Sequence, residues 1–568
     1  MNYTDFLLPL FLLYWLIVMI LDRRGTLAKH NITAYGPILM LRTTKGQEFL
    51  DRLAIHKRFW RTFANIGLPA MLIGMLLMFL LVLFIDYSLI TSFKTQTVPM
   101  PSKYNEARNI FLIPGLNEFI PLYWGAIALL VTLAVHEFSH AILCKVEGIK
   151  VKSMGLLLAP IPIGGFAEPD DEQLLGKKEN NVPENGSLPE QTTQPPKKLA
   201  TRTERIRVLT AGVMANFTTA FIAFILFFLL LGYITSVGDV MVTNVIPDSP
   251  AHLNGVKPNM ILTGINDNKI ANATEFLSYA NSITPGSTVK LDFIENGVRK
   301  EIKLNATGSN ISLSGVKIST VIEGSAAEKA GIKDGMIIVK IDDTEIKEVS
   351  NFVNFMNSTK EEQKIDVYLL SNSSLNASTL EFKAIELGRN PDPMGLKKGF
   401  LGLSYSPEQG VSYSIGIEIG QFPAKSYLHM LKSIPSLMTG ITGWIIIFGL
   451  PITGFAGEGF PGFSGLLMNF YEPTGWVAVL GIGVFWILNS LLWIGWMNLY
   501  AGLFNCLPMV PLDGGHVFRD IMTSSFTRIF GDGEKVEKIS NAIVIIFAIM
   551  IFLSFVFVMV APYAAHGF

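Results

Sequence analysis

Long apolar runs constrain the fold of this chain more than any other feature of its sequence. A helix needs about 20 apolar residues to cross the roughly 30 Å hydrocarbon core of a bilayer. Six runs approach or exceed that length: Leu7–Leu21, Ile66–Ile90, Phe119–Cys144, Ile206–Tyr233, Val477–Tyr500 and Ile539–Val560. Only 16% of the 568 residues are charged, below the roughly one quarter found in soluble proteins. The sequence therefore predicts a polytopic α-helical membrane protein with about six transmembrane helices.

The Lys and Arg residues beside these runs predict the orientation in a cell membrane, because basic loops stay on the cytoplasmic side. The segments Arg23–Arg61 and Arg519–Lys538 are both basic and are expected inside. The loop 146–205 then lies inside and residues 234–430 lie outside. A glycine-interrupted apolar stretch, Leu437–Phe455, is expected to be interfacial or re-entrant. The net charge of −1 argues against nucleic acid as a partner.

Two polar blocks separate the apolar runs. Residues 170–204 are rich in Pro, Gln, Asn and charge, which is typical of a disordered loop. The block 234–390 contains an internal repeat, in which residues 245–270 match residues 321–346 at a constant spacing of 76 residues. Each copy has the pattern of strand, short helix, strand, helix and strand. The repeat predicts two similar α/β domains in tandem.

The stretch VTLAVHEFSHAILCKVEGI (131–149) places ionisable groups in an apolar run, where their burial is costly. In a helix, His136 and His140 lie one turn apart on one face, so both imidazoles can reach one ion. Glu137 lies beside them, close enough to a metal-bound water to accept its proton. The alternative is a set of surface residues without a function, which the apolar surroundings disfavour. We therefore predict a catalytic zinc site.

A catalytic zinc site needs a third protein ligand and leaves the fourth position for water. Cys144 lies about 12 Å along the helix from the first histidine, so it is expected to be a buried packing residue. The loop NCLPMVPLDGGHVFRD (505–520) offers Asp513 on a tight, non-helical segment beside apolar runs. His516, three residues further on, is the alternative ligand. The loop could also be only a turn between two spans.

Together these motifs resemble the site-2 protease family, the zinc intramembrane metalloproteases. The resemblance is carried by HEFSH, by Gly212-x-x-x-Asn216 in the next apolar run, and by N-x-x-P-x-x-P-L-D-G-G from Asn505 to Gly515. It is close over two stretches, 119–235 and 477–520, and the N-terminal pair of spans resembles archaeal members. The family usually has proline after the glycine of the second motif, where this chain has valine.

The resemblance implies a set of site residues: His136, His140 and Asp513 as Zn²⁺ ligands, Glu137 as the catalytic base and proton donor, and Asn505 and Asn216 as substrate-binding residues. It implies an endopeptidase that cleaves transmembrane segments in regulated intramembrane proteolysis, with the active site toward the cytoplasm. Segment 154–170 corresponds to a membrane-edge β-hairpin that is proposed to hold the substrate as an added strand.

The two repeat copies resemble PDZ domains of the bacterial-protease type, whose mark S-x-A-x-x-x-G-[IV]-x-x-x-M-I begins at Ser249 and at Ser325. Such domains add an extended peptide to a sheet edge beside a helix. Neither copy contains the G-[LF]-G-F loop of signalling PDZ domains, so capture of a peptide C-terminus is not expected. The resemblance implies two extracytoplasmic, peptide-binding PDZ-like domains. A pair of purely structural β-domains is the alternative.

The sequence thus predicts seven segments: an N-terminal transmembrane pair with a basic cytoplasmic segment (1–118), the first half of the protease core (119–233), PDZ-like domains 1 and 2 (234–310 and 311–390), a linker with the interfacial segment (391–474), the third core helix with the LDGG loop (475–530) and a C-terminal transmembrane helix (531–568). The predicted partners are transmembrane protein substrates, peptide segments and the lipid bilayer.

A second function fits the same sequence. A non-proteolytic membrane scaffold or chaperone could bind extracytoplasmic peptides through the PDZ pair. Such a protein would bind peptides without zinc and would cleave nothing.

Overall fold

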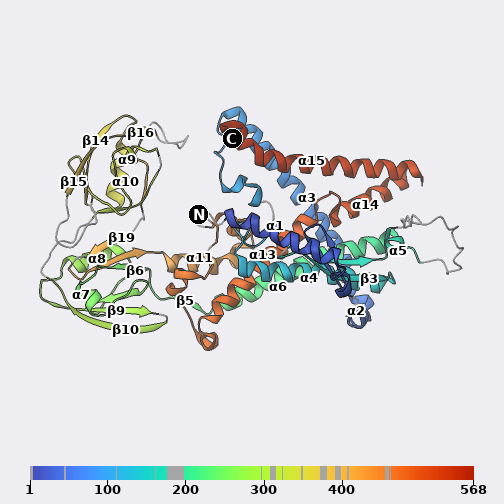
Figure 1. Ribbon diagram of the computed structural model, residues 1–568, viewed down its shortest axis with the longest axis horizontal. Coiled ribbons are helices and arrows are strands. Elements are labelled where there is room, and N and C mark those ends of the chain that lie inside the picture. Colours follow the sequence, from blue (N-terminus) through green and yellow to red (C-terminus); the bar gives the residue numbers. More distant parts are fainter. Residues whose placement is uncertain are drawn as a thin grey trace. The chain divides into compact units, whose positions relative to one another are not determined.

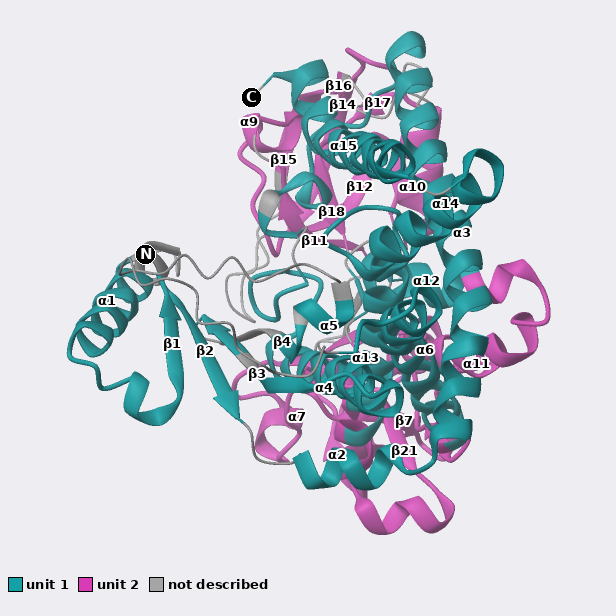
Figure 2. Ribbon diagram, turned by 90° about the vertical axis from the view of Figure 1, so that its right-hand side faces the viewer, with its two compact units in different colours: residues 1–229, 445–460, 487–568 teal, residues 230–444, 461–486 magenta. Residues whose placement is uncertain are grey.

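A computed structural model describes most of the chain (Figure 1). The residues outside the description are 1–3, 44–46, 110–111, 160, 176–197, 296, 308–314, 323, 347–348, 371–379, 390–397, 406–408, 413, 455–458, 461, 532 and 568. The predicted disordered loop therefore lies largely outside the described residues. The chain divides into two compact units (Figure 2): unit 1 is Met1–Leu229, Ile445–Phe460 and Ile487–Phe568, and unit 2 is Leu230–Trp444 and Pro461–Trp486.

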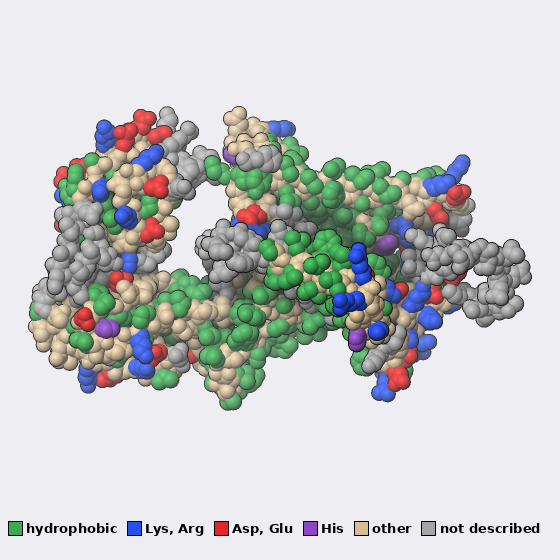
Figure 3. All heavy atoms as spheres, viewed as in Figure 1, with side chains coloured by type: hydrophobic (Ala, Val, Ile, Leu, Met, Phe, Trp, Pro, Cys, Tyr) green, Lys and Arg blue, Asp and Glu red, His purple; other side chains and the backbone are tan. Residues whose placement is uncertain are grey.

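The apolar runs form long helices. In the described part of the chain, five helices are long and apolar enough to cross a membrane: α3 (Lys57–Thr95), α4 (Leu122–Glu147), α6 (Arg202–Leu231), α13 (Gly483–Asn505) and α15 (Glu534–His566). Large apolar side chains stay exposed on them, such as Ile73 and Leu76 on α3 and Ile549 and Phe552 on α15. Hydrophobic side chains dominate the helical surface in Figure 3. A surface of this kind is suited to lipid, and the predicted membrane protein with a helical core is confirmed.

The number of spans remains a prediction. The first apolar run forms α1 (Thr4–Arg23), which is not one of the five helices. The glycine-interrupted run forms the helix α12 (Ile441–Thr453), whose 13 residues include Pro451. At about 1.5 Å per residue this helix is too short to span a bilayer alone.

A four-stranded antiparallel sheet packs on α4 in unit 1. Its order is β1 (Ile32–Tyr35), β2 (Ile38–Thr43), β3 (Val151–Ala159) and β4 (Ile161–Pro169). The pair β3–β4 contains the hairpin that the resemblance implied for 154–170. The sequence did not predict that β1 and β2, from the N-terminal segment, would extend it. Strand β4 is one of the two edge strands, and it makes most of the sheet's contact with α4, with a smaller contribution from β3.

Unit 2 contains two similar sheets, one for each copy of the repeat. The first begins with β6 (Val240–Val245), α7 (Pro250–Leu253), β7 (Ile261–Ile265), β8 (Asn268–Lys269), α8 (Ala273–Asn281), β9 (Thr288–Glu295) and β10 (Val298–Asn305). The second contains β11 (Val316–Val321), α9 (Ala326–Lys329), β12 (Ile337–Ile341), β13 (Thr344–Glu345), α10 (Val349–Ser358), β14 (Lys364–Leu370), β15 (Leu380–Glu386) and β18 (Leu403–Tyr405). Each sheet has its own apolar core, with Phe276 buried in the first and Phe352 in the second.

The first sheet is completed by residues that follow the second sheet in the chain. Strands β19 (Gln409–Ser412) and β20 (Ile417–Gln421) pair with each other, and β20 pairs with β6. The sequence assigned these strands to a linker, because alternating residues indicate a strand but not its partner. The second repeat is therefore inserted into the fold of the first.

The remaining elements complete the described part of the chain. They are α2 (Gln47–Ala54), α5 (Asp171–Leu175), β5 (Ile234–Ser236), β16 (Gly388–Arg389), β17 (Gly399–Phe400), α11 (Ala424–Leu437), β21 (Tyr471–Pro473), α14 (Asp513–Phe530) and the 3₁₀ helices Ala28–His30, Lys103–Asn105, Ala107–Asn109, Gly465–Phe470 and Gly475–Leu480.

Candidate metal centre

Helix α4 carries the first two residues of the candidate site. The helix begins after Pro121 and ends at Gly148, whose left-handed φ of 74° suits glycine at a helix C-terminus. His136 and His140 leave the same face of the helix, and their Nε2 atoms lie 3.1 Å apart. Their side chains are 12% and 14% exposed. The geometry predicted from the i, i+4 spacing is present in the structure.

Asp513 approaches the two histidines from another helix. Its Oδ2 lies 3.3 Å from the Nε2 of His136 and 3.3 Å from the Nε2 of His140. Among the described residues these three form the one group of His, Cys, Asp and Glu side chains that could hold a metal ion. His516, the alternative third ligand, is not in this group.

The backbone at Asp513 differs from the sequence prediction. Prolines before it and glycines after it predict a non-helical loop, but Asp513 is the first residue of α14. A Cβ on Gly514 or Gly515 would collide with the backbone of the preceding turn. The two glycines therefore allow the first turn of α14 to pack directly on the segment that leaves α13, instead of forming a loop.

The proton position on His140 follows from its contact with α6. Its Nδ1 lies 2.8 Å from the carbonyl oxygen of Val208. A carbonyl can only accept, so Nδ1 carries the proton and Nε2 keeps a free lone pair. Gly212 makes this approach possible, because a Cβ there would collide with both imidazoles. The glycine of the G-x-x-x-N motif is a packing requirement of the site.

Asn216 contacts the other histidine. Its side-chain amide is buried and lies 3.2 Å from the Nδ1 of His136. Its Oδ1 has no hydrogen-bond partner among the described residues. The two orientations of the Asn216 amide, related by a 180° flip, are equivalent in shape. In the flipped orientation the Nδ1–H of His136 donates to Oδ1 of Asn216, and the Nε2 of His136 keeps its lone pair for a metal ion. Asn216 can therefore orient a ligand, while its predicted contact with substrate stays a prediction.

Glu137 lies against the edge strand β4. The backbone N–H of Ala167 donates to its Oε2 at 2.7 Å. A Cβ on Gly165 would come within 2.9 Å of the Glu137 Cγ, so this glycine allows the strand to pass beside the carboxylate. The carboxylate that was predicted as the base is thus held by one hydrogen bond from the sheet.

Two other residues singled out from the sequence are not among the three donors. Asn505 is the last residue of α13. Its substrate-binding role stays a prediction. Cys144 is buried in an apolar cluster with Leu143 and Ile142, which agrees with the packing role expected for it.

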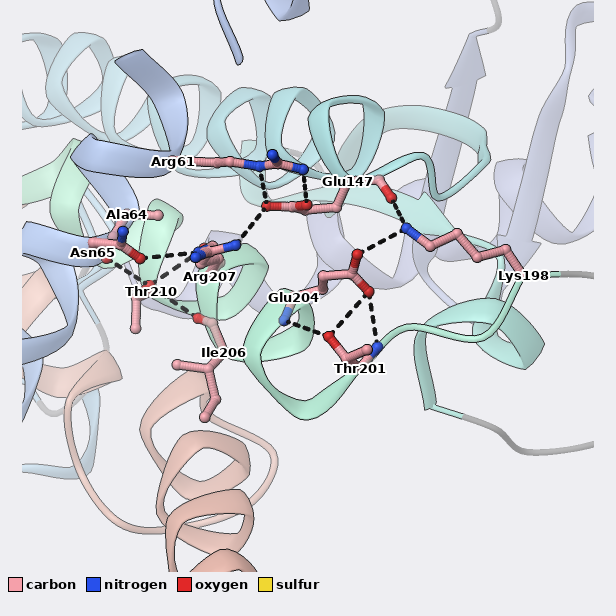
Figure 4. Close-up of polar contacts among 10 residues, drawn as sticks. All are labelled: Arg61, Ala64, Asn65, Glu147, Lys198, Thr201, Glu204, Ile206, Arg207 and Thr210. Carbon is pink, nitrogen blue, oxygen red and sulfur yellow. Dashed lines mark hydrogen bonds and ion pairs between the residues drawn. The ribbon is translucent and has the colours of Figure 1, made fainter. Parts of the chain in front are cut away.

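A second polar cluster surrounds Glu147, the last residue of α4 (Figure 4). The Nε and Nη2 of Arg61 on α3 donate to its two carboxylate oxygens at 3.0 and 2.7 Å. Arg207 on α6 adds a contact of 3.3 Å. The Glu147 side chain is 0% exposed. This network joins the end of the helix that carries His136 and His140 to α3 and α6.

The sequence analysis did not find this network. Glu147 lies 11 residues after His136, roughly 16 Å along the helix, so its spacing shows only that it cannot be a ligand of the same ion. One signal was present: an acidic residue in the last turn of a helix opposes the helix dipole, and a buried carboxylate requires a cation. The cations that pair with Glu147 are Arg61 and Arg207, which lie 86 and 60 positions away from it in the sequence. No local sequence pattern indicates contacts over such separations.

Apolar spanning helices and a His, His, Asp donor set beside a glutamate are the features of a membrane metallopeptidase. The sequence profile of peptidase family M50 matches residues 124–551, and the chain belongs to that family. The resemblance to site-2 proteases is thereby confirmed.

Three relatives were found. The chain is 38% identical over 144 residues to an uncharacterized protein of Methanocaldococcus jannaschii, a match that covers 25% of this chain and 36% of that relative. It is 23% identical over 459 residues to a protein of Neisseria meningitidis with the provisional name zinc metalloprotease, which covers 72% of this chain and 92% of the relative. A third match, 31% over 103 residues, is to the periplasmic pH-dependent serine endoprotease DegQ of Escherichia coli, covering 18% of this chain and 23% of that protein.

Proposed function

We propose that this chain is a zinc-dependent intramembrane endopeptidase that cleaves transmembrane segments of other membrane proteins in regulated proteolysis. The observation that carries the proposal is the convergence of His136, His140 and Asp513 beside Glu137, on helices of the apolar unit. Family membership supports a metallopeptidase. The substrate class is inferred from the placement of His136 and His140 on α4, a helix suited to lipid.

Zinc fits the three donors. Two imidazole nitrogens and one carboxylate oxygen are a ligand set that catalytic Zn²⁺ takes. The Oδ2 of Asp513 is buried and has no hydrogen-bond donor among the described residues, so a cation would satisfy it. When bound, Zn²⁺ would act as a Lewis acid toward the scissile carbonyl and make a water molecule more acidic.

Glu137 would move the proton in this reaction. One carboxylate oxygen accepts the N–H of Ala167, which fixes the side chain in one orientation beside the donors. We infer that the carboxylate accepts the proton of the attacking water and later gives it to the leaving amine. Asn216 would keep His136 in the tautomer that ligates, and Asn505 would contact the substrate backbone.

Strand β4 supports the proposal that the substrate binds in an extended form. It pairs with β3 on one side, and within the described sheet no strand pairs with its other side. A helical substrate hides its amides in its own hydrogen bonds, and unwinding it in an apolar setting costs those bonds. Pairing with a strand edge beside Glu137 would replace them.

We also propose that the two repeats are PDZ-like domains on the extracytoplasmic side that bind extended peptides, with the metal centre toward the cytoplasm. The repeated sheets, each with a helix packed beside an edge, support the peptide-binding part. The basic segments at both ends of the chain support the orientation.

The test is cleavage of a reporter single-pass substrate by purified protein in detergent, with zinc measured on the same samples. Glu137→Gln is expected to lower cleavage by about 10²–10⁴-fold, while zinc stays near the wild-type content because this side chain is not a ligand. Activity of Glu137→Gln within tenfold of wild type would refute the assigned role. A scaffold or chaperone would show no cleavage by the wild-type protein and peptide binding that survives chelation.

A further inference from the structure

The two sheets of unit 2 correspond strand for strand except at one edge. The first has the order β10-β9-β7-β6-β20-β19, and the second has the order β15-β14-β12-β11-β18. The spacing of 76 residues places Val245 of β6 over Val321 of β11, and Phe276 of α8 over Phe352 of α10. In this alignment β20 corresponds to β18. Strand β19 has no counterpart among the described strands of the second sheet.

The loops that lead into β20 and β18 confirm that these strands are equivalent. In the first repeat, Gly416 accepts a hydrogen bond from the N–H of Ile246, and Ile415 accepts one from Ala251. In the second repeat, the carbonyls of Gly402 and Leu401 accept from Ile322 and Ala327. The two glycines have matching positive φ values, 81° and 79°.

These loops also explain why the sequence showed no glycine loop inside either copy. The corresponding residues are Ser414–Ile417 and Phe400–Leu403, with the sequences SIGI and FLGL, and both follow the second copy. Each repeat does have a glycine turn, which lies just before β20 in the first and just before β18 in the second.

Strand β19 occupies the edge of the first sheet beside its helix. It pairs antiparallel with β20, with Ser412 opposite Ile417 and Gln409 opposite Gly420. Helix α8 contacts both β19 and β20, and the N–H of Ala273 at its start donates to the side chain of Gln421 at 2.6 Å. An antiparallel strand at this edge, beside this helix, is where a peptide would add to such a sheet.

We propose that Gln409–Ser412 is a tethered strand that fills the peptide site of the first repeat, so that the peptide binding proposed above falls to the second repeat. The inference rests on that peptide binding and is independent of zinc and of cleavage. Strand β18 pairs with β11, and no described strand pairs with its other side. Tyr405 of β18 contacts Phe352 of α10 at a ring distance of 5.2 Å, so the strand and helix of the second repeat lie side by side.

The tether gives β19 a large advantage over a free peptide. Only residues 413–416 connect β19 to β20, and short connections produce effective concentrations in the millimolar range. A free peptide of equal intrinsic affinity at micromolar concentration would therefore occupy the site about 10³ times less often. The ion pair between Lys317 on β11 and Glu418 on β20, at 2.6 Å, links β20 to the second repeat.

Amide hydrogen exchange on the full-length protein in detergent tests the proposal directly. Residues 417–421 are expected to exchange at least tenfold more slowly than residues 403–405, because β20 is paired on both sides, whereas among the described strands β18 is paired only with β11. Equal rates in the two strands would overturn the proposal, since the first edge would then be open as well.

Proline variants test whether β19 is the segment that blocks the site. Alternate residues of an antiparallel strand donate to a given neighbour, so either Gly410→Pro or Val411→Pro removes a bond to β20. In the variant that loses this bond, the amide hydrogens of residues 417–421 are expected to exchange faster than in the wild type. The same variant is expected to bind a synthetic SPEQGVSY peptide (residues 406–413) at least tenfold more tightly than the wild type. Val411→Ala, which keeps the N–H, is the matched control and is expected to behave as wild type.

Two results would contradict the tethered strand. One is that wild-type protein binds the peptide at β20 as tightly as the proline variants do. The other is unchanged exchange at 417–421 in both proline variants. Continued protection of β7 and β9 shows that the first sheet remains folded. None of these readouts involves peptide-bond cleavage, so the outcome does not depend on the metal centre.

Discussion

Helix α4 carries two polar clusters, and they differ in how completely their charges are paired. At its end, Glu147 has a fully buried carboxylate that receives hydrogen bonds from Arg61 and Arg207. Two turns earlier along α4, the Nε2 atoms of His136 and His140 face the carboxylate of Asp513 on α14. The Oδ2 of Asp513 has no hydrogen-bond donor among the described residues. The first cluster is complete as it stands, whereas a cation would complete the second.

This difference separates a structural role from a catalytic one. A buried charge with all its partners stabilises the packing of the elements that supply them, and loss of one partner is costly. A group of lone pairs pointing at one another is unfavourable unless an ion lies between them. Three variants on the two clusters test this interpretation, from the largest expected effect to the smallest.

Asp513→Ala is expected to have the largest effect. It leaves two ligands, which cannot hold zinc in a catalytic geometry, so zinc content and cleavage should both fall to background. Metal analysis and cleavage of the reporter substrate on the same preparation provide the measurement. Cys144→Ala is the control, and it should change neither quantity. If Asp513→Ala keeps its zinc while His516→Ala loses it, the third ligand has been misassigned.

Glu147→Gln is expected to affect stability and to spare the metal. The amide keeps the shape of the side chain but leaves Arg61 and Arg207 without an anion. Because the Arg61 side chain is 44% exposed and can reach water, we expect a loss of about 1–3 kcal/mol in the free energy of unfolding. Thermal unfolding in detergent measures this loss, and zinc content should stay at the wild-type level. If Glu147→Gln instead lost zinc at unchanged stability, the assignment of a structural role to the Glu147 cluster would be wrong.

Asn216→Ala is expected to weaken metal binding without abolishing it. The amide contacts His136 Nδ1 at 3.2 Å, and removing such an outer contact typically costs about 10–100-fold in metal affinity. Competition with a chelator measures the change. Asn216→Asp should retain more affinity than alanine, because its carboxylate can still accept the Nδ1 proton. Equal affinity in wild type and alanine variant would show that Asn216 serves another purpose, such as the predicted contact with substrate.

The sequence was most informative where chemistry depends on local spacing. His136, Glu137 and His140 lie within one and a half turns of a helix, so their joint orientation follows from helix geometry alone. Asp513 was inferred from its unusual place between apolar runs and from the family resemblance. Its helical backbone was missed because Gly514 and Gly515 are typical of loops, whereas here they permit close packing.

The sequence was least informative about partners that are distant along the chain. Nothing in residues 32–43 indicates pairing with β3, and nothing in Ile417–Gln421 indicates β6 as its neighbour. Strand propensity is a property of a segment, but sheet order depends on which segments meet in three dimensions. The ion pairs of Glu147 were missed for the same reason.

The insertion of one repeat into the other also fixes the order in which the two can be finished during synthesis. Ile415, Ile417 and Ile419 are fully buried in the core of the first repeat, yet the ribosome makes them after all the described strands of the second. At about 5–20 residues per second, the earlier strands of the first repeat wait on the order of ten seconds for their last strand. The second repeat, which is continuous in the chain, can fold during that interval. An unfinished sheet of this kind would be a natural substrate for chaperones.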